Sequence, residues 1–197
     1  MHARTRIALT TLLVGLVSAP TPALAQDARW YAGFGLGLST AQDACDGISG
    51  PGIACDDEDT AFKLLGGYRV NPNFAVEFAY TGLGEASASF AGFGTISVES
   101  SGFEVLAVAT APVGAQWSLY GKIGLFRWDL DVNDGTGVVG SFSESGTDLT
   151  YGLGASYDFS RDSALRIEYQ QYTDVGDPNT SGTTDVSVIG AGLIFRF

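Results

Sequence analysis

Apolar residues alternate with small or polar residues in eight separate segments of this 197-residue chain. The clearest segment is the last: every second residue from Ile189 to Phe197 is apolar, and Gly190, Gly192 and Arg196 are among the residues between them. A period of two residues places alternate side chains on opposite faces of a β-strand. Each segment therefore predicts a strand with one continuous apolar face, and the chain stops on such a strand with an aromatic residue.

Two kinds of connection separate the predicted strands. The other seven strands are expected at 30–39, 61–70, 74–81, 103–109, 117–128, 148–159 and 165–170. Short turns are expected at 71–73, 112–116 and 160–163, and long polar loops at 40–59, 82–95, 131–146 and 173–184. Alternating short and long connections are typical of up-and-down antiparallel strands, with the turns at one rim and the loops at the other.

The length and composition of the segments indicate how the strands are arranged. The ranges above give the alternating part of each strand, and we expect whole strands of roughly nine to 14 residues, the span of a tilted transmembrane β-strand. The 27 glycines and 12% aromatic residues favour tightly packed β-structure over helices. Hydrocarbon does not tolerate an unpaired strand edge, and a closed barrel has none. The sequence therefore predicts an all-β fold, an eight-stranded antiparallel up-and-down transmembrane β-barrel; a water-soluble eight-stranded barrel with apolar residues inside is the alternative.

The N-terminal region has the three parts of a secretory signal peptide. Arg4 and Arg6 form a basic start, residues 7–17 form an apolar core, and Ala-Leu-Ala at 23–25 is a small-x-small cleavage site. We therefore predict a cleaved signal peptide at residues 1–25 and a barrel domain at residues 26–197.

The chain is strongly acidic, and its acidic residues concentrate between the predicted strands. The formal net charge is −12, and removal of the predicted signal peptide takes away two of the 10 Lys and Arg residues, which leaves 8 − 22 = −14. Nucleic acid is not an expected partner, because phosphate backbones are bound by basic surfaces. We expect the acidic residues in loops exposed to solvent.

The first long loop contains Cys45 and Cys55, the only two cysteines. Export to an oxidising compartment favours a disulfide, which removes roughly 3 kcal/mol of unfolded-state entropy; two free thiols are the alternative. No metal site is predicted, because the only histidine lies in the predicted signal peptide. The acidic run at 56–59, with Asp43 and Asp46, lacks the ligand spacing of a calcium loop. It is interpreted as a solvated surface rather than a site for Ca²⁺ or for divalent ions shared with lipopolysaccharide.

Charged residues recur on the strand face opposite the apolar one. Eight strands enclose a lumen barely wide enough for side chains, and an unpaired buried charge costs several kcal/mol. We therefore predict a paired network that plugs the lumen, formed by Lys63, Arg69, Glu77, Glu104, Lys122, Asp158, Arg166 and Glu168. Hairpin registers assumed from the turns place Glu77 diagonal to Arg69, Glu104 diagonal to Lys122, and Asp158 opposite Arg166. A gate on a narrow ion or water path is the alternative role.

Three segments carry a family resemblance: WYAGFGLG at 30–37, ALRIEY at 164–169 and GLIFRF at 192–197. With them the chain resembles the OmpA-type transmembrane domain and the related small opacity and surface-antigen barrels of Gram-negative bacteria. The resemblance implies an outer-membrane location, contact with outer-membrane lipid and lipopolysaccharide, and a signal for the barrel assembly machinery at Phe195 and Phe197. Full-length OmpA proteins also carry a peptidoglycan-binding domain, and cell-wall anchoring by that route is not expected here.

No catalytic site and no cofactor are predicted. Lipid-modifying barrel enzymes use a histidine to activate a serine or a water, and the chain has none after residue 25. The leading hypothesis is a non-enzymatic structural and surface protein with a packed polar lumen and long acidic extracellular loops. One alternative is an adhesin-like protein whose loops bind a host or phage partner. The other is a narrow pore for ions or small solutes.

Overall fold

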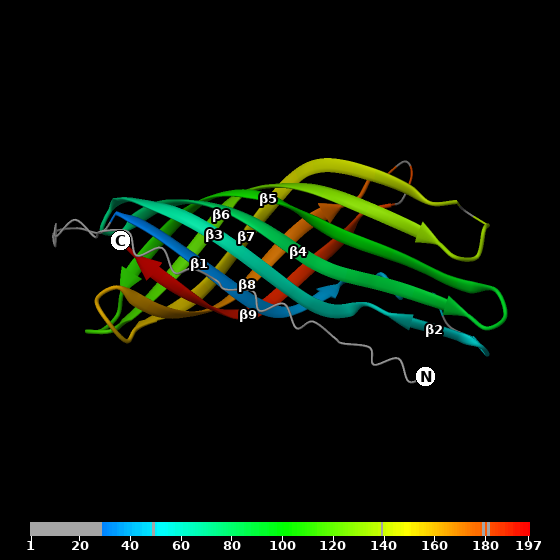
Figure 1. Ribbon diagram of the computed structural model, residues 1–197, viewed down its shortest axis with the longest axis horizontal. Helices are drawn as coiled ribbons and strands as arrows, with labels where there is room; N and C mark the ends of the chain where they lie inside the picture. The colour runs from blue at the N-terminus through cyan, green and yellow to red at the C-terminus, as the bar shows by residue number, and fades with distance from the viewer. Residues whose placement is uncertain (1–28, 49, 139, 179, 181) are drawn as a thin grey trace, which may run out of the picture.

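The computed structural model describes residues 29–197 apart from 49, 139, 179 and 181, and nine β-strands form within these residues (Figure 1). The predicted signal peptide, residues 1–25, lies outside the described residues. The strands are β1 (Trp30–Ala41), β2 (Ile53–Asp56), β3 (Glu58–Asn71), β4 (Phe74–Phe90), β5 (Gly94–Pro112), β6 (Trp117–Asp134), β7 (Phe142–Asp158), β8 (Ser163–Val175) and β9 (Thr184–Arg196). No helix in this part of the chain is long and apolar enough to cross a membrane.

Eight of the strands close into a barrel. Each pairs antiparallel with the next barrel strand, and β1 also pairs with β9, so the first and last strands complete the ring. At this seam Tyr31 lies opposite Arg196, and Leu38 lies opposite Ile189. The predicted eight-stranded up-and-down barrel is therefore confirmed. The short strand β2 is an addition that pairs with the loop end of β4.

The two faces of the strands differ as the alternation predicts. Leu36, Phe78 and Ile123 point outward and are 62%, 61% and 54% exposed, whereas Glu77 and Lys122 point into the lumen and are 1% and 4% exposed. An apolar band of this kind is costly in water, and it matches the lipid-facing surface of a transmembrane barrel. A water-soluble barrel would have the opposite arrangement, so that alternative is set aside.

Two predicted loops are largely β-structure. Residues 82–95 form the end of β4, a turn at 91–93 and the start of β5. Residues 131–146 include the end of β6 and the start of β7. The prediction was wrong here because the alternation of large apolar residues stops while the backbone ladder continues. Residues beyond the bilayer need no lipid-facing side chains, so small and polar residues suffice there. Both hairpins extend past the barrel wall, at the end opposite the C-terminus (Figure 1).

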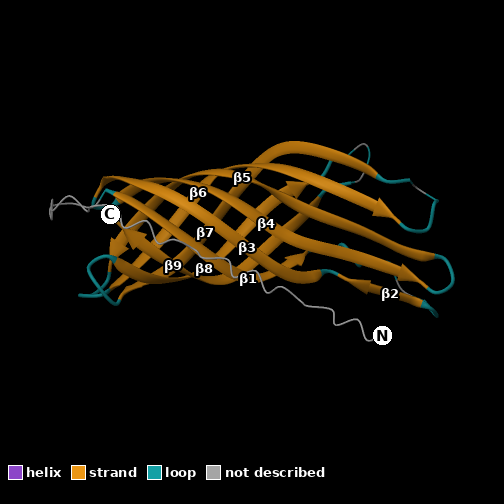
Figure 2. Cartoon of the chain, viewed as in Figure 1, coloured by secondary structure: helices purple, strands orange, loops and turns teal. Residues whose placement is uncertain are grey.

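The other rim has short turns, and it also holds the end of β9 (Figure 2). In the turn between β3 and β4, the Asn71 side-chain oxygen accepts hydrogen bonds from the backbone N–H groups of Asn73 and Phe74, each at 2.9 Å. Such an Asx turn reverses the chain within two residues. Tight turns of this kind are typical of the periplasmic rim of an outer-membrane barrel, and the protruding hairpins then lie on the extracellular side.

Candidate functional site

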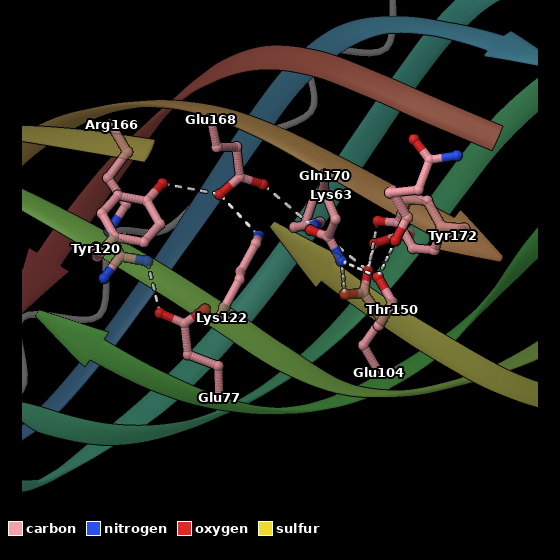
Figure 3. A network of polar contacts seen from close by, with 12 residues as sticks. Lys63, Glu77, Glu104, Tyr120, Lys122, Thr150, Arg166, Glu168, Gln170 and Tyr172 are labelled. Atoms are coloured by element: carbon pink, nitrogen blue, oxygen red, sulfur yellow. Dashed lines mark hydrogen bonds and ion pairs between the residues drawn. The ribbon is translucent and has the colours of Figure 1, made fainter. Parts of the chain in front are cut away.

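The lumen is the candidate functional site, because six charged side chains from five strands meet in it (Figure 3). Three are cations and three are anions: Lys63 on β3, Glu77 on β4, Glu104 on β5, Lys122 on β6, and Arg166 and Glu168 on β8. Each occupies an inward position of its strand, opposite the apolar face. The equal numbers give these six side chains no net formal charge, which is the arrangement that buried charges require.

Arg166 and Glu77 form the pair nearest the short turns. The Arg166 Nη1 atom lies 2.5 Å from Glu77 Oε1, and the Tyr31 hydroxyl donates a hydrogen bond of 2.7 Å to the same carboxylate oxygen. The guanidinium also lies over the Tyr120 ring, 4.9 Å from its centroid, and 5.4 Å from that of Tyr31. A charge-assisted hydrogen bond and two aromatic faces hold this cation in one position.

Glu168 connects the two lysines in the middle of the lumen. Its Oε2 atom lies 2.8 Å from Lys122 Nζ and accepts a hydrogen bond of 3.0 Å from the Tyr120 hydroxyl. Its Oε1 atom lies 3.2 Å from Lys63 Nζ. One carboxylate therefore balances two cations, as the dashed contacts in Figure 3 show.

Glu104 is held mainly by neutral hydrogen-bond donors. It lies 3.4 Å from Lys63 Nζ, and it accepts a bond of 2.8 Å from the Tyr172 hydroxyl and one of 2.7 Å from the Gln170 amide. The hydroxyl of Thr81 also donates to it. The Gln170 amide in turn donates to Thr150, at 2.7 Å. The sequence prediction omitted these uncharged partners. Their inward strand positions were a usable signal: Gln170, for example, lies two residues beyond Glu168 and therefore on the same face of the strand.

The predicted charge pairs differ from those in the structure. We expected Glu77 with Arg69, Glu104 with Lys122, and Asp158 with Arg166. The structure instead pairs Glu77 with Arg166, Lys122 with Glu168, and Asp158 with Arg196 at 2.5 Å. Arg69 lies at the turn rim, 6.0 Å from the Tyr31 ring centroid.

Two physical reasons account for the difference. The β3–β4 turn sets the register that we assumed, because Glu77 lies opposite Gly67 and therefore diagonal to Arg69. The other two turns set other registers: Lys122 lies opposite Val108, and Asp158 lies opposite Ala164. In addition, long side chains cross a narrow lumen, which lets β3 and β4 make ion pairs with β8 on another part of the wall. Hairpin geometry alone therefore does not identify the partners.

An apolar layer fills the lumen on the loop side of the charges. It consists of buried side chains from several strands: Ala61, Leu83, Phe126, Trp128, Leu130, Val132, Tyr172, Val175, Val186 and Val188. Phe126 and Tyr172 pack edge to face with centroids 4.7 Å apart, and Tyr172 thereby joins this layer to Glu104. The Trp128 indole donates a hydrogen bond of 2.7 Å to Asp148. The sequence prediction did not include this layer.

The first loop is closed by a disulfide. Cys45 and Cys55 are bonded, with their Cα atoms 5.8 Å apart, which confirms the predicted bridge. Cys55 belongs to β2 and lies opposite Ala88 of β4, so the bridge connects the loop to the β4–β5 hairpin. In the described part of the chain, no three His, Cys, Asp or Glu side chains are placed to hold a metal ion.

The residues of the predicted assembly signal lie on the outer surface at the turn rim. Phe195 and Phe197 are both exposed, and the backbone N–H of Phe197 donates a hydrogen bond of 3.0 Å to the Trp30 carbonyl. Trp30 packs against Tyr68 with ring centroids 4.8 Å apart. Aromatic residues at this level fit an interfacial girdle, and the role of the two phenylalanines in assembly stays a prediction.

Lipid-facing apolar strands, a lumen filled by paired charges, and short turns at one rim with long connections at the other define an integral β-barrel protein of the Gram-negative outer membrane. Comparison with known families agrees with this class. The outer membrane protein beta-barrel domain family matches residues 9–197, and the chain belongs to that family.

Relatives support the same assignment. Outer membrane protein A of Klebsiella pneumoniae is 29% identical over 184 residues, which cover 87% of this chain and 52% of that protein. The chain spans about half the length of the curated relatives it matches. The resemblance to OmpA-type barrels noted from the sequence is confirmed.

Solved structures of small barrels have the same fold. Neisserial surface protein A has a TM-score of 0.58 and 15% identity, covering 87% of this chain and 98% of that one. Ail, the attachment invasion locus protein of Yersinia pestis, was solved in complex with the heparin analogue sucrose octasulfate. It has a TM-score of 0.51 and 17% identity, covering 86% of this chain and 99% of its own. At these identities the likeness concerns the fold alone.

Proposed function

We propose that this protein is a non-enzymatic structural and surface protein of the outer membrane, with a filled lumen that stabilises the barrel and an acidic loop region that faces the exterior. The observation that carries the proposal is the packing of the lumen. The charges of the network contact one another within 3.4 Å, and the apolar layer lies between them and the loops.

Two layers in series argue against the narrow pore. An ion would have to displace the lumen charges from their partners and then pass the apolar side chains around Phe126, where it would lose its hydration. Enzymatic activity has little support for a different reason. Glu77, Glu104 and Glu168 all accept hydrogen bonds inside the network, so none of these carboxylates is placed to act on a substrate.

Planar-bilayer recording of the refolded barrel tests the proposal. We expect no conductance steps from the wild type, from Glu104→Ala or from Lys122→Ala, because the apolar layer stays intact in each. A general porin refolded in the same lipid establishes that the assay detects channels. Discrete steps from the wild type that change size in either variant would support the pore and contradict the filled-lumen proposal.

A second role, interaction through the loop end, is favoured by the protruding hairpins. Their connecting segments expose large apolar side chains: Phe93 is 78% exposed between β4 and β5, and Val138 is 81% exposed between β6 and β7. Exposed apolar residues on an extended hairpin are suited to contact a host or phage surface, or the lipopolysaccharide around the barrel. The acidic character of this end disfavours a polyanion of the kind bound in the Ail structure.

Adhesion of bacteria that display the protein tests the second role. The double variant Phe93→Ser/Val138→Ser should reduce host-cell binding or phage adsorption while the heat-dependent gel shift of the folded barrel stays unchanged. A matched control, Phe159→Ser, removes an exposed aromatic residue from the turn rim and should have no effect on binding. Equal binding by the wild type and the hairpin variant would show that neither side chain contributes to host-cell binding or phage adsorption.

A further inference from the structure

A cavity of about 470 Å³ lies at the loop end of the barrel, above the apolar layer. The first loop, the β4–β5 hairpin and the start of β9 surround it. Its floor includes Leu83, Leu130, Val175 and Val186, which belong to the buried apolar layer. The volume is within the range of sites that take small molecules, roughly 300–1,000 Å³.

A β-bulge in β4 creates this space. Leu83 has no partner in the ladder to β5, where Gly82 lies opposite Ser101 and Gly84 lies opposite Ser100. The extra residue changes which side chains point inward, and Gly84 takes the positive φ of 85° that such a bulge needs. Beyond it the inward positions are Gly84, Ala86 and Ala88, facing Ser100, Val98 and Ile96. The small side chains of Ala86 and Ala88 leave the cavity unfilled, whereas Gly84 lies against the Asp59 side chain.

Among the described residues that line the cavity, one buried side-chain oxygen has no hydrogen-bond partner. Ser100 is 8% exposed, and its hydroxyl is buried without a hydrogen-bond partner in the described residues. Buried hydroxyl groups are nearly always paired, because desolvation without a hydrogen bond is unfavourable. A molecule in the cavity with a polar group at this depth would satisfy the Ser100 hydroxyl.

The rim of the cavity carries only negative charge among the described residues that line it. Asp43, Asp56, Asp57 and Glu85 lie at the rim, and the other lining residues are uncharged. Asp43 and Asp57 belong to the first loop. Glu85 lies opposite Glu99, and Asp56 lies opposite Ser87, so these two side chains lie on the outer face of the hairpin and add negative charge beside the opening. Such a potential attracts cations and repels anions.

We propose that this cavity binds a small amphiphile: an organic cation whose apolar body lies on the floor, with a polar atom at Ser100 and its charged group at the acidic rim. This site is separate from the ionic network, and it adds to the proposed structural role without depending on it. Its chemistry excludes fatty acids and sulfated sugars, because both would bring negative charge to the rim.

The test uses two probes of nearly equal shape and opposite charge, 4-phenylbutylammonium and 4-phenylbutyrate. Binding to the protein in lipid nanodiscs would be measured by calorimetric titration, with empty nanodiscs correcting for partition into lipid. The cation should bind at least roughly tenfold more tightly than the anion, about 1.4 kcal/mol. Exchange of two rim charges, Asp43→Asn/Asp57→Asn, should weaken binding of the cation and leave the fold unchanged, because Asp43 is exposed and Asp57 is only half-buried.

A cavity-filling variant tests the location. Ala86→Phe places a ring in the space opposite Val98 and should weaken binding of the cation roughly tenfold or more. Ser97→Phe, which adds the same ring to the other face of the hairpin, is the matched control and should bind as the wild type does. The heat-dependent gel shift verifies that both variants fold. Equal binding of the two probes, no binding above that of empty nanodiscs, or equal affinities of Ala86→Phe and Ser97→Phe would each overturn the proposal.

Discussion

The loop half of the lumen is filled by apolar side chains, whereas the turn half combines the ion pairs with apolar side chains such as Leu106 and Val108. On the turn side of β6 the inward residues include Tyr120 and Lys122, whereas on the loop side they are Phe126, Trp128 and Leu130. The outward face of the same strand stays apolar wherever it meets lipid. The bilayer therefore determines only the outer face, and the inner face depends on what lies across the lumen.

The halves differ in how they respond to loss of a side chain. In the turn half each carboxylate is balanced by cations, so removal of one leaves buried charges without a partner. In the loop half the contacts are non-directional, and removal of one side chain leaves a cavity that its neighbours partly fill. The ionic half should therefore be more sensitive to single substitutions than the apolar half.

The largest expected effect is that of Glu168→Ala in the ionic half. This carboxylate balances Lys63 and Lys122 and accepts a hydrogen bond from Tyr120. Its removal should lower the free energy of unfolding by about 3–5 kcal/mol, measured by urea unfolding in lipid vesicles. Glu99→Ala, which removes an exposed carboxylate from β5, is the control and should change it by less than about 0.5 kcal/mol. Equal values for the two variants would mean that the network does not stabilise the barrel.

Leu130→Ala in the apolar half should have a smaller effect. Leu130 is 5% exposed and packs in the apolar layer, so the loss should be about 2–3 kcal/mol by the same measurement. Val138→Ala, in the exposed connection between β6 and β7, is the control and should leave stability unchanged. If Leu130→Ala costs more than Glu168→Ala, the order of sensitivity argued for the two halves is wrong.

The same contrast explains what the sequence could predict. Eight strands, their outward faces and the inward placement of Glu77 and Lys122 follow from the alternation, because lipid imposes an apolar face on every spanning segment. The disulfide followed from two cysteines in one exported loop. These features depend on local sequence and on the solvent around the barrel.

Other features depend on distance across the lumen, which a linear pattern does not contain. Glu77 pairs with Arg166, 89 residues further along the chain, because the side chains reach between strands that are not neighbours. The apolar layer was missed for a related reason. Leu130 and Val132 follow Lys122 at even spacing and so lie on the same inward face, but we assigned apolar residues to the lipid face alone. Continuing this alternation beyond Trp128 predicts both residues in the lumen.

Removal of the disulfide should affect the loop rim much more than the barrel. In the double variant Cys45→Ser/Cys55→Ser, the amides of β2 should exchange with solvent roughly tenfold faster or more, because β2 is a four-residue strand paired with β4. Unfolding of the barrel should change by less than about 1 kcal/mol, since its ladders remain. Hydrogen exchange measures the first effect, and wild-type protein treated with a thiol reductant should reproduce it. A large loss of barrel stability would show that the loop and the barrel unfold together.

Deletion of Phe197 at the turn rim should have the smallest effect on stability. Its side chain is 71% exposed, and its backbone donates a single hydrogen bond to Trp30, so the free energy of unfolding should fall by less than about 1 kcal/mol. The amount of folded protein in the outer membrane should nevertheless decrease if the assembly machinery recognises the terminal aromatic residue. Phe159→Ser, which removes another exposed aromatic side chain from the same rim, should leave both quantities unchanged. Comparison of refolding in vitro with levels in isolated outer membranes separates the two effects. A normal level of the deletion variant in the membrane would assign Phe197 to the aromatic girdle alone.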